Sequence, residues 1–168
     1  MSGRIYNVLF LCTGNSARSI LGEALLNTMG ASRFHAYSAG SHPAGQVQPL
    51  ARELAIEMGY DPARLRSKSW DEFAAADAPR MDFILTVCDS AAGEACPLWP
   101  GHPATAHWGV PDPAAVQGDA ATRRAAFRAT LLALRQRIEL LIALPDEKLD
   151  ALAARASLAA IAAQAGAA

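Results

Sequence analysis

The junction between a short apolar run and a helical pattern near the start of the chain constrains the fold most. Residues 5–11 (IYNVLFL) are apolar except for Asn7, which is typical of a buried strand. Residues 16–29 carry apolar side chains at the spacing of one helix face. Between the two patterns lies a polar stretch, CTGNSARS, that begins at Cys12 and ends at Ser19. A strand that passes through a tight loop into a helix is typical of α/β folds.

The same alternation continues along the chain. Further strands are expected at residues 34–39, 82–87 and 104–108, and further helices at 47–58 and 122–144. The helix at 122–144 has the clearest pattern, because its apolar residues recur every three or four positions. This alternation predicts a mostly parallel sheet with helices on both sides, joined by right-handed crossovers. With 168 residues, of which 52% are hydrophobic, the chain is expected to form a single α/β domain.

An alanine-rich stretch follows the last helix of this pattern. Pro145 interrupts the chain, and residues 146–164 have high helix propensity. We therefore expect a domain at 1–144 and a helical C-terminal extension at 145–168. The sequence assigns no function to the extension.

Charge and cysteine content exclude several classes of protein. The net charge of -1 provides no basic field for nucleic acid. The apolar run at 8–11 is too short for a signal peptide or a membrane span, so a cytoplasmic protein without a membrane partner is expected. The cysteines are Cys12, Cys88 and Cys96, an odd number in a chain without a secretion signal. Reactive thiols are therefore a better interpretation than a structural disulfide framework.

The polar loop has the composition of an oxyanion site. It lies between a strand and a helix, where successive backbone N–H groups can turn around a tetrahedral anion. Arg18 adds a planar charged fork, and the positive surroundings favour the thiolate form of Cys12. Gly14 and Asn15 tolerate the left-handed backbone angles of a tight loop. The alternative is a buried, inert Cys12 beside an ordinary surface arginine. The residues predicted to surround the anion are Thr13, Gly14, Asn15, Ser16, Ala17, Arg18 and Ser19.

The loop resembles the Cys-x5-Arg-Ser motif of low-molecular-weight protein tyrosine phosphatases and of the arsenate reductases that share their fold. Similar segments extend the resemblance to about residues 5–144. These segments are Tyr37 to Gly40, Thr86 to Asp89, His107 to Gly109, and Asp112 with Pro113. The resemblance implies a four-stranded parallel sheet in the strand order 2-1-3-4, and it implies that Asp112 is the general acid.

The three cysteines fit the reductase branch of that family. In the implied strand order, Cys12 and Cys88 follow the carboxyl ends of neighbouring strands about 4.8 Å apart, which is close enough for a disulfide. The resemblance implies that Cys12 attacks arsenate, with Asp112 as general acid. Cys88 would then attack Cys12 and release arsenite, and Cys96 would attack Cys88. A thioredoxin-type dithiol would reset the enzyme, and no metal or organic cofactor is needed.

Other functions stay open. A protein tyrosine phosphatase is the main alternative, although Ala114 and Ala115 stand where that branch usually has an aromatic pair for the phosphotyrosine ring. A non-catalytic oxyanion-binding module is disfavoured, because binding alone does not require two further thiols. Within the reductase interpretation, glutaredoxin with glutathione, or mycothiol, could replace thioredoxin as the reductant.

Potassium binding is also left open. Some thioredoxin-linked reductases carry a potassium site, and Asn15, Glu23 and Ser38 match three of its residues. The expected acidic fourth residue falls near Trp70, with Asp71 one place later.

Overall fold

The fold alternates strands and helices through most of its length. The computed structural model describes residues 4–87 and 103–154. In chain order the elements are β1 (Tyr6–Cys12), α1 (Arg18–Met29), β2 (Phe34–Gly40), α2 (Pro49–Glu57), η1 (Pro62–Arg64), α3 (Asp71–Ala74), β3 (Phe83–Thr86), β4 (Ala104–His107), η2 (Pro113–Ala115) and α5 (Ala120–Ile142). η1 and η2 are single turns of 3₁₀ helix.

All four strands belong to one parallel sheet. Their order is β2-β1-β3-β4, and β1 pairs with β2 on one side and with β3 on the other. The predicted strand order 2-1-3-4 is therefore confirmed. The register pairs Cys12 with Gly40 and Leu11 with Thr86, and Thr86 in turn pairs with His107. The carboxyl ends of the strands thus meet along one edge of the sheet, where open α/β sheets bind ligands.

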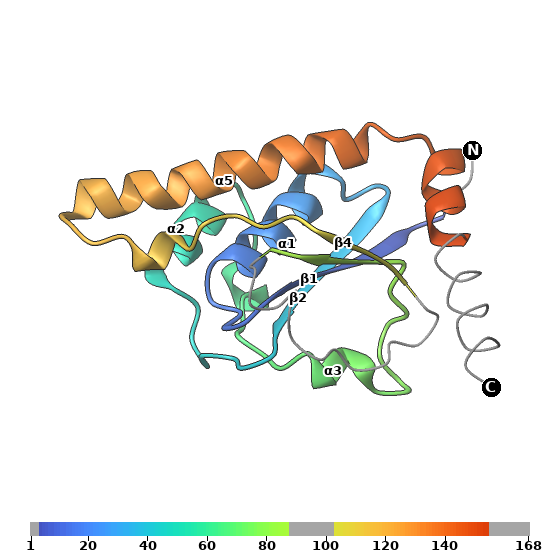
Figure 1. The fold of residues 1–168 in the computed structure, drawn as a ribbon, viewed down its shortest axis with the longest axis horizontal. Coiled ribbons are helices and arrows are strands. Elements are labelled where there is room, and N and C mark those ends of the chain that lie inside the picture. The colour runs from blue at the N-terminus through green and yellow to red at the C-terminus, as the bar shows by residue number, and fades with distance from the viewer. Residues whose placement is uncertain (1–3, 88–102, 155–168) are drawn as a thin grey trace.

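Helices cover both faces of the sheet. α1, α2 and α5 lie on one face and the short α3 on the other, as Figure 1 shows. Alternate residues of β1 point to opposite faces: Val8 and Phe10 join the core under α1 and α5, whereas Leu9 and Leu11 join a smaller cluster with Phe73 of α3. This two-sided burial explains why the first strand is an almost unbroken apolar run.

The helix boundaries differ slightly from the sequence pattern. α1 begins at Arg18 rather than at residue 16, because the preceding residues form the polar loop. α5 begins at Ala120, two residues before the expected start, because Asp119 caps it by accepting the Thr122 N–H at 2.8 Å. α3 and the two 3₁₀ turns were not expected, since elements of three or four residues carry too few side chains for a periodic pattern.

A further helix follows Pro145 and occupies residues 146–154 of the described chain. Its Leu149 is fully buried and belongs to the main core. Two contacts anchor it: Arg33 donates to Asp146 at 2.6 Å, and the Tyr6 hydroxyl donates to Asp150 at 2.8 Å. The first turns of the C-terminal extension therefore pack as part of the domain, and a division of the chain at 144/145 stays a prediction.

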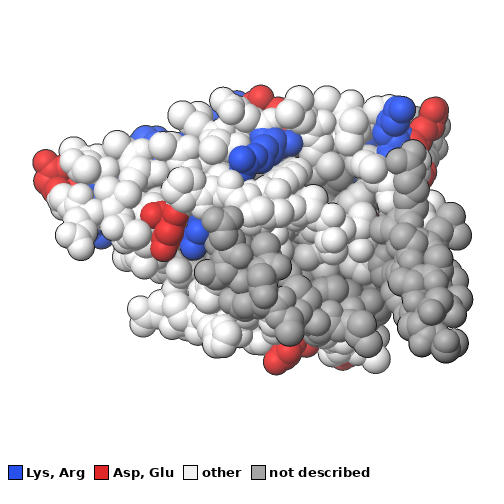
Figure 2. Space-filling model, in the orientation of Figure 1, with Lys and Arg blue, Asp and Glu red and all other residues white. Residues whose placement is uncertain are grey.

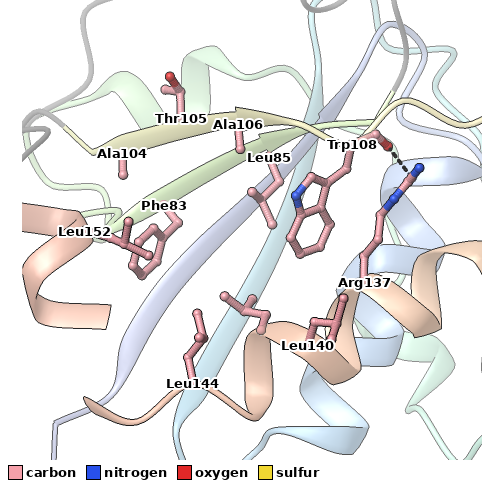
Figure 3. A pocket seen from close by; sticks show the side chains of 11 residues that line it. Phe83, Leu85, Ala104, Thr105, Ala106, Trp108, Arg137, Leu140, Leu144 and Leu152 are labelled. Atoms are coloured by element: carbon pink, nitrogen blue, oxygen red, sulfur yellow. Dashed lines mark hydrogen bonds between the residues drawn. The ribbon is translucent and has the colours of Figure 1, made fainter. Parts of the chain in front are cut away.

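An apolar groove of about 410 Å³ lies between the β3–β4 side of the sheet, the end of α5 and the helix at 146–154. Phe83, Trp108, Leu144 and Leu152 point into it from these elements (Figure 3). On the described part of the face in Figure 2, Lys and Arg side chains are scattered among uncharged ones. Within the described residues, no helix combines the length and apolar character needed to cross a membrane.

Candidate active site

The polar loop at residues 13–17 joins the carboxyl end of β1 to the first turn of α1. Its carbonyl oxygens are bound from one side by the segment that follows β2. The Thr13, Gly14 and Ser16 carbonyls accept hydrogen bonds of 2.8 to 2.9 Å from backbone N–H groups of residues 42, 44 and 48. In a trans peptide the N–H points away from the C=O, so the next N–H groups in the chain face the opposite side. The Asn15 N–H does so, donating to Cys12 Sγ at 3.2 Å.

Asn15 gives the loop its curvature. It is the only non-glycine residue with positive φ in the described chain, at 47°. Its side chain compensates for this strain with two hydrogen bonds: Nδ2 donates to Ser19 Oγ at 2.8 Å, and Oδ1 accepts the Lys68 N–H at 2.9 Å. Of the two residues expected to provide left-handed backbone angles, Asn15 does so, whereas Gly14 does not have positive φ.

Cys12 lies at the floor of this loop and is 3% exposed. Its sulfur lies 2.9 Å from Ser19 Oγ. Since Asn15 Nδ2 already donates to that oxygen, the Ser19 hydroxyl proton is available to the sulfur. The Cys12 sulfur thus has two hydrogen-bond partners within the loop region, the Asn15 N–H and the Ser19 hydroxyl. In this structure the Ser19 hydroxyl therefore contacts both the Cys12 sulfur and the Asn15 side chain.

Arg18 connects the loop to the segment after β4. Its guanidinium donates to the Val110 carbonyl at 3.2 Å and lies 3.8 Å from Asp112 Oδ2. Asp112 caps η2, since its Oδ1 accepts the Ala114 N–H at 2.9 Å. The Asp112 side chain is 44% exposed and that of Arg18 is 17% exposed. The structure thus brings the candidate proton donor to the candidate anion-binding arginine.

Arg137 of α5 fixes the start of the Asp112 loop. It donates to the carbonyls of Trp108 and Gly109 at 3.0 and 3.2 Å. Figure 3 shows the first of these bonds beside the Trp108 ring, which packs at 6.3 Å, centroid to centroid, from Phe10 of β1. The loop that carries Asp112 is therefore held by both α5 and the sheet.

Gly40 supports the loop from the neighbouring strand. A methyl group placed on its Cα would come within 2.5 Å of the Thr13 carbonyl oxygen and 3.0 Å of Asn15 N. Real Cβ atoms do not approach backbone atoms this closely, so any other residue at position 40 would displace the loop.

A second polar cluster lies beside this loop and is buried. Glu23 of α1, 4% exposed, accepts hydrogen bonds from Ser38 at 2.8 Å and from Tyr60 at 2.6 Å. Lys68 is 8% exposed, and its Nζ lies 3.8 Å from Glu23 Oε1 and 3.4 Å from Ser38 Oγ. Burial lowers the pKa of Lys68, an effect that the charge of Glu23 opposes.

The contacts of this cluster bear on whether Asn15, Glu23 and Ser38, the residues that match a potassium site, could bind the ion. Glu23 and Ser38 are present and adjacent, but the Lys68 ammonium lies against both of them. A potassium ion beside it would face a like charge in a buried site, so the residues do not fit potassium binding. The described residues also hold no cluster of three or more His, Cys, Asp or Glu side chains that could bind a metal.

The structure thus gathers Cys12, the loop up to Ser19 and Asp112 into one place. Cys88 and Cys96 lie outside the described residues. Sequence reasoning missed Gly40, Tyr60 and Lys68, whose importance arises from contacts between distant segments. The available signals were that Gly40 ends the Tyr37 to Gly40 segment of the family resemblance and that Lys68 is one of only two lysines in the chain.

Comparisons with known proteins agree with this geometry. The family "Low molecular weight phosphotyrosine protein phosphatase" matches residues 7–154. An arsenate reductase of Bacillus subtilis is 35% identical over 121 residues, which cover 72% of this chain and 84% of the relative. The crystal structure of an arsenate reductase from Archaeoglobus fulgidus is 30% identical and superposes with a TM-score of 0.63, covering 82% of this chain and 99% of the other.

A phosphatase is also among the similar structures. The low molecular weight protein tyrosine phosphatase from T. tengcongensis is 25% identical, with a TM-score of 0.65 and coverage of 82% of this chain and 97% of the other. The resemblance inferred from the loop motif is confirmed by both kinds of relative. The chain belongs to the low molecular weight phosphotyrosine protein phosphatase family, in which it is similar to arsenate reductases.

Proposed function

We propose that this protein reduces arsenate to arsenite, with Cys12 as the nucleophile. The observation that carries the proposal is the position of the Cys12 sulfur, which receives the Asn15 N–H at 3.2 Å within a loop whose Arg18 meets Asp112. The relatives named arsenate reductase support the choice of arsenate. Residues 13–19 are the proposed oxyanion-binding residues.

The first step forms a sulfur–arsenic bond. The Cys12 thiolate attacks arsenic, a hydroxyl group of the arsenate leaves as water after receiving a proton from Asp112, and arsenic stays in the +5 state. Arg18 holds two of the remaining oxygens. No metal or organic cofactor takes part in this step.

The second step transfers two electrons. Cys88 attacks Cys12 Sγ and a Cys12–Cys88 disulfide forms, while the electron pair of the broken S–As bond leaves with arsenic as arsenite. Described residues support this geometry: the Val87 N–H donates to the Leu11 carbonyl at 2.9 Å, so the residue before Cys88 lies beside the residue before Cys12. Cys96 then attacks Cys88, which frees Cys12 as a thiolate and leaves a Cys88–Cys96 disulfide. An external dithiol of the thioredoxin type reduces that disulfide.

Arsenate-dependent NADPH oxidation with thioredoxin and thioredoxin reductase tests the whole cycle. The wild type should turn over, whereas Cys12→Ser should be inactive but still bind sulfate, a stable oxyanion, because the loop amides and Arg18 remain. Wild-type turnover only with glutaredoxin and glutathione, or only with mycothiol, would identify a different reductant. Normal arsenate reduction by Cys12→Ser would overturn the proposal.

Single-turnover measurements separate the thiols. After mixing with arsenate and quenching in acid, Cys88→Ser should release no arsenite, because nothing attacks the Cys12 adduct. Cys96→Ser should release a single burst and then stop at the Cys12–Cys88 disulfide. Continued turnover of both variants with thioredoxin would rule out the relay.

The second candidate is a protein tyrosine phosphatase, which the family and the T. tengcongensis relative favour. The same thiolate loop would accept a phosphate ester. The Asp112 turn continues into Pro113 and two alanines, so it offers no aromatic side chain to stack on a phosphotyrosine ring. Hydrolysis of an aryl phosphate by the wild type and by the Cys88→Ser and Cys96→Ser variants, with no arsenate-dependent NADPH oxidation by the wild type, would identify a phosphatase that needs only Cys12.

A further inference from the structure

The Lys68 ammonium occupies a site built from oxygen atoms. Nζ lies 2.9 Å from the Arg66 carbonyl, 3.4 Å from Ser38 Oγ and 3.8 Å from Glu23 Oε1. Carboxylate, hydroxyl and carbonyl oxygens are the ligands of alkali cations as well as of ammonium groups. The arrangement therefore amounts to a monovalent-cation site in which the cation is covalently attached to the chain.

The carboxylate of Glu23 makes a cation necessary there. Glu23 is almost fully buried, and a buried carboxylate is strongly disfavoured unless charge and hydrogen bonds compensate for it. Its hydrogen bonds come from the neutral hydroxyls of Ser38 and Tyr60. Burial, followed by the Glu23 charge, raises the pKa of Tyr60, so this hydroxyl keeps its proton. Lys68 forms the ion pair with Glu23, at 3.8 Å, and the charge of Arg66 interacts with Glu23 as a weaker contribution.

The backbone of Lys68 connects this site to the nucleophile. Its N–H donates to Asn15 Oδ1 at 2.9 Å, and its carbonyl accepts the Gly40 N–H at 2.9 Å. Asn15 in turn donates its own N–H to Cys12 Sγ. A residue whose side chain is fixed by Glu23 thus holds, through its main chain, the one strained residue of the anion loop.

We propose that Lys68 is a positioning residue that replaces a bound monovalent cation: its tethered ammonium neutralises Glu23 and thereby fixes Asn15 and the oxyanion loop. The wild-type enzyme is then indifferent to potassium. Shortening the Lys68 side chain opens a cation site that potassium or ammonium ions can fill. The effect on turnover rests on the proposed function, whereas the cation site itself does not.

Three variants test this inference. Lys68→Ala removes the ammonium and leaves a space, Lys68→Met removes the charge but fills the space, and Lys148→Ala is the control at the exposed second lysine. Each is compared with the wild type in potassium chloride and in tetramethylammonium chloride at equal concentration, since tetramethylammonium is too large for the site. The readouts are the midpoint of thermal unfolding and the affinity for sulfate measured by calorimetry.

We expect Lys68→Ala to unfold about 5 to 10 °C below the wild type in tetramethylammonium chloride, because a buried charge pair is broken. Potassium should restore much of this loss and of the sulfate affinity. Lys68→Met should be destabilised and should not respond to potassium. The wild type and Lys148→Ala should behave identically in both salts.

A wild type that binds sulfate more tightly in potassium than in tetramethylammonium would overturn the inference, and this measurement needs no variant to fold. An equal response of Lys68→Ala and Lys68→Met to potassium would also overturn it, because the effect would then be general to salt. If arsenate is not reduced but the cation response of Lys68→Ala is present, the proposed function fails and the cation site stands.

Discussion

The Arg18 guanidinium lies 3.8 Å from the Asp112 carboxylate, although one residue begins the first helix and the other follows the last strand. The contact places the candidate anion-binding residue next to the candidate proton donor. It exists because β1 and β4 end at the same edge of a parallel sheet. An anion bound by Arg18 would therefore lie within reach of Asp112, and each of the two side chains can be tested separately.

Asp112→Asn removes the proton that Asp112 donates in the proposed mechanism. Asn keeps an oxygen to accept the Ala114 N–H, so the turn at η2 should persist. We expect the rate of adduct formation in single turnover to fall by roughly 10²- to 10⁴-fold, with sulfate affinity largely retained.

The chain offers a matched control for this change. Asp61 precedes a Pro-Ala pair in η1 and accepts the Ala63 N–H at 3.0 Å, as Asp112 does in η2. Asp61→Asn should leave the rate unchanged. Equal rates for Asp112→Asn and Asp61→Asn would remove Asp112 from the mechanism.

Arg18→Lys keeps the positive charge but loses the planar guanidinium group. A lysine can hold one oxygen of the anion but cannot donate to two oxygens in parallel. We expect kcat/KM for arsenate to fall about 100-fold, equivalent to about 2.7 kcal/mol. Arg66→Lys, at an exposed arginine paired with Glu72, is the control. Steady-state kinetics with the full reducing system measures both variants, and an unchanged kcat/KM for Arg18→Lys would show that charge alone suffices.

Hydrophobic periodicity was enough to predict the sheet and its main helices. β1, β2 and β3 are short and mostly buried, and α5 carries its apolar residues on one face, so local pattern and tertiary burial agree there, whereas β4 is largely exposed. The strand order came from the family resemblance and not from periodicity. α3 has four residues and could not be found by periodicity, because a single turn does not repeat.

The site was predictable only where it is local in sequence. Cys12, Asn15 and Arg18 lie within one loop, so their types and spacing indicate an anion site. Lys68 reaches that loop from a distant segment through one backbone N–H, while its buried ammonium lies against Glu23 of α1. No periodicity encodes such a contact, and a lysine in isolation is typical of a solvated surface position. The roles of Cys88 and Cys96 stay predictions.

Gly40→Ala tests whether the loop needs the neighbouring strand to lack a side chain. The added methyl group would clash with the Thr13 carbonyl oxygen at 2.5 Å, and neither partner can move without shifting the loop. We expect a loss of about 1 to 3 kcal/mol in the free energy of unfolding, together with weaker sulfate binding. Gly14→Ala is the comparison for stability, because its methyl group would have no neighbour closer than 3.5 Å. Equal stability of the two variants would contradict the packing argument.

Leu149→Ala measures how strongly the helix after Pro145 belongs to the domain. Leu149 is fully buried in the main core, whereas Leu152 of the same helix is 43% exposed. We expect Leu149→Ala to lower the free energy of unfolding by about 2 to 5 kcal/mol and Leu152→Ala to lower it much less. Urea denaturation of both variants gives the comparison. A small effect at Leu149 would favour a domain that ends at residue 144.

The tyrosines make stability depend on alkaline pH. Burial, the first cause in each case, raises the pKa of Tyr6, Tyr37 and Tyr60, and that of Tyr6 reaches about 12 beside Asp150. A raised pKa means that the folded state binds the proton more tightly than the unfolded chain does. The resulting stability is complete below the ordinary tyrosine pKa of 10.0 and is lost as the pH rises through about 12.

Tyrosinate absorbance of the folded protein should therefore stay low at pH 10. The free energy of unfolding of Tyr6→Phe should depend less steeply on pH in this window than that of the wild type. A folded wild type that ionises any tyrosine near pH 10, or a Tyr6→Phe variant with an unchanged slope, would show that these hydroxyls are not protected by burial.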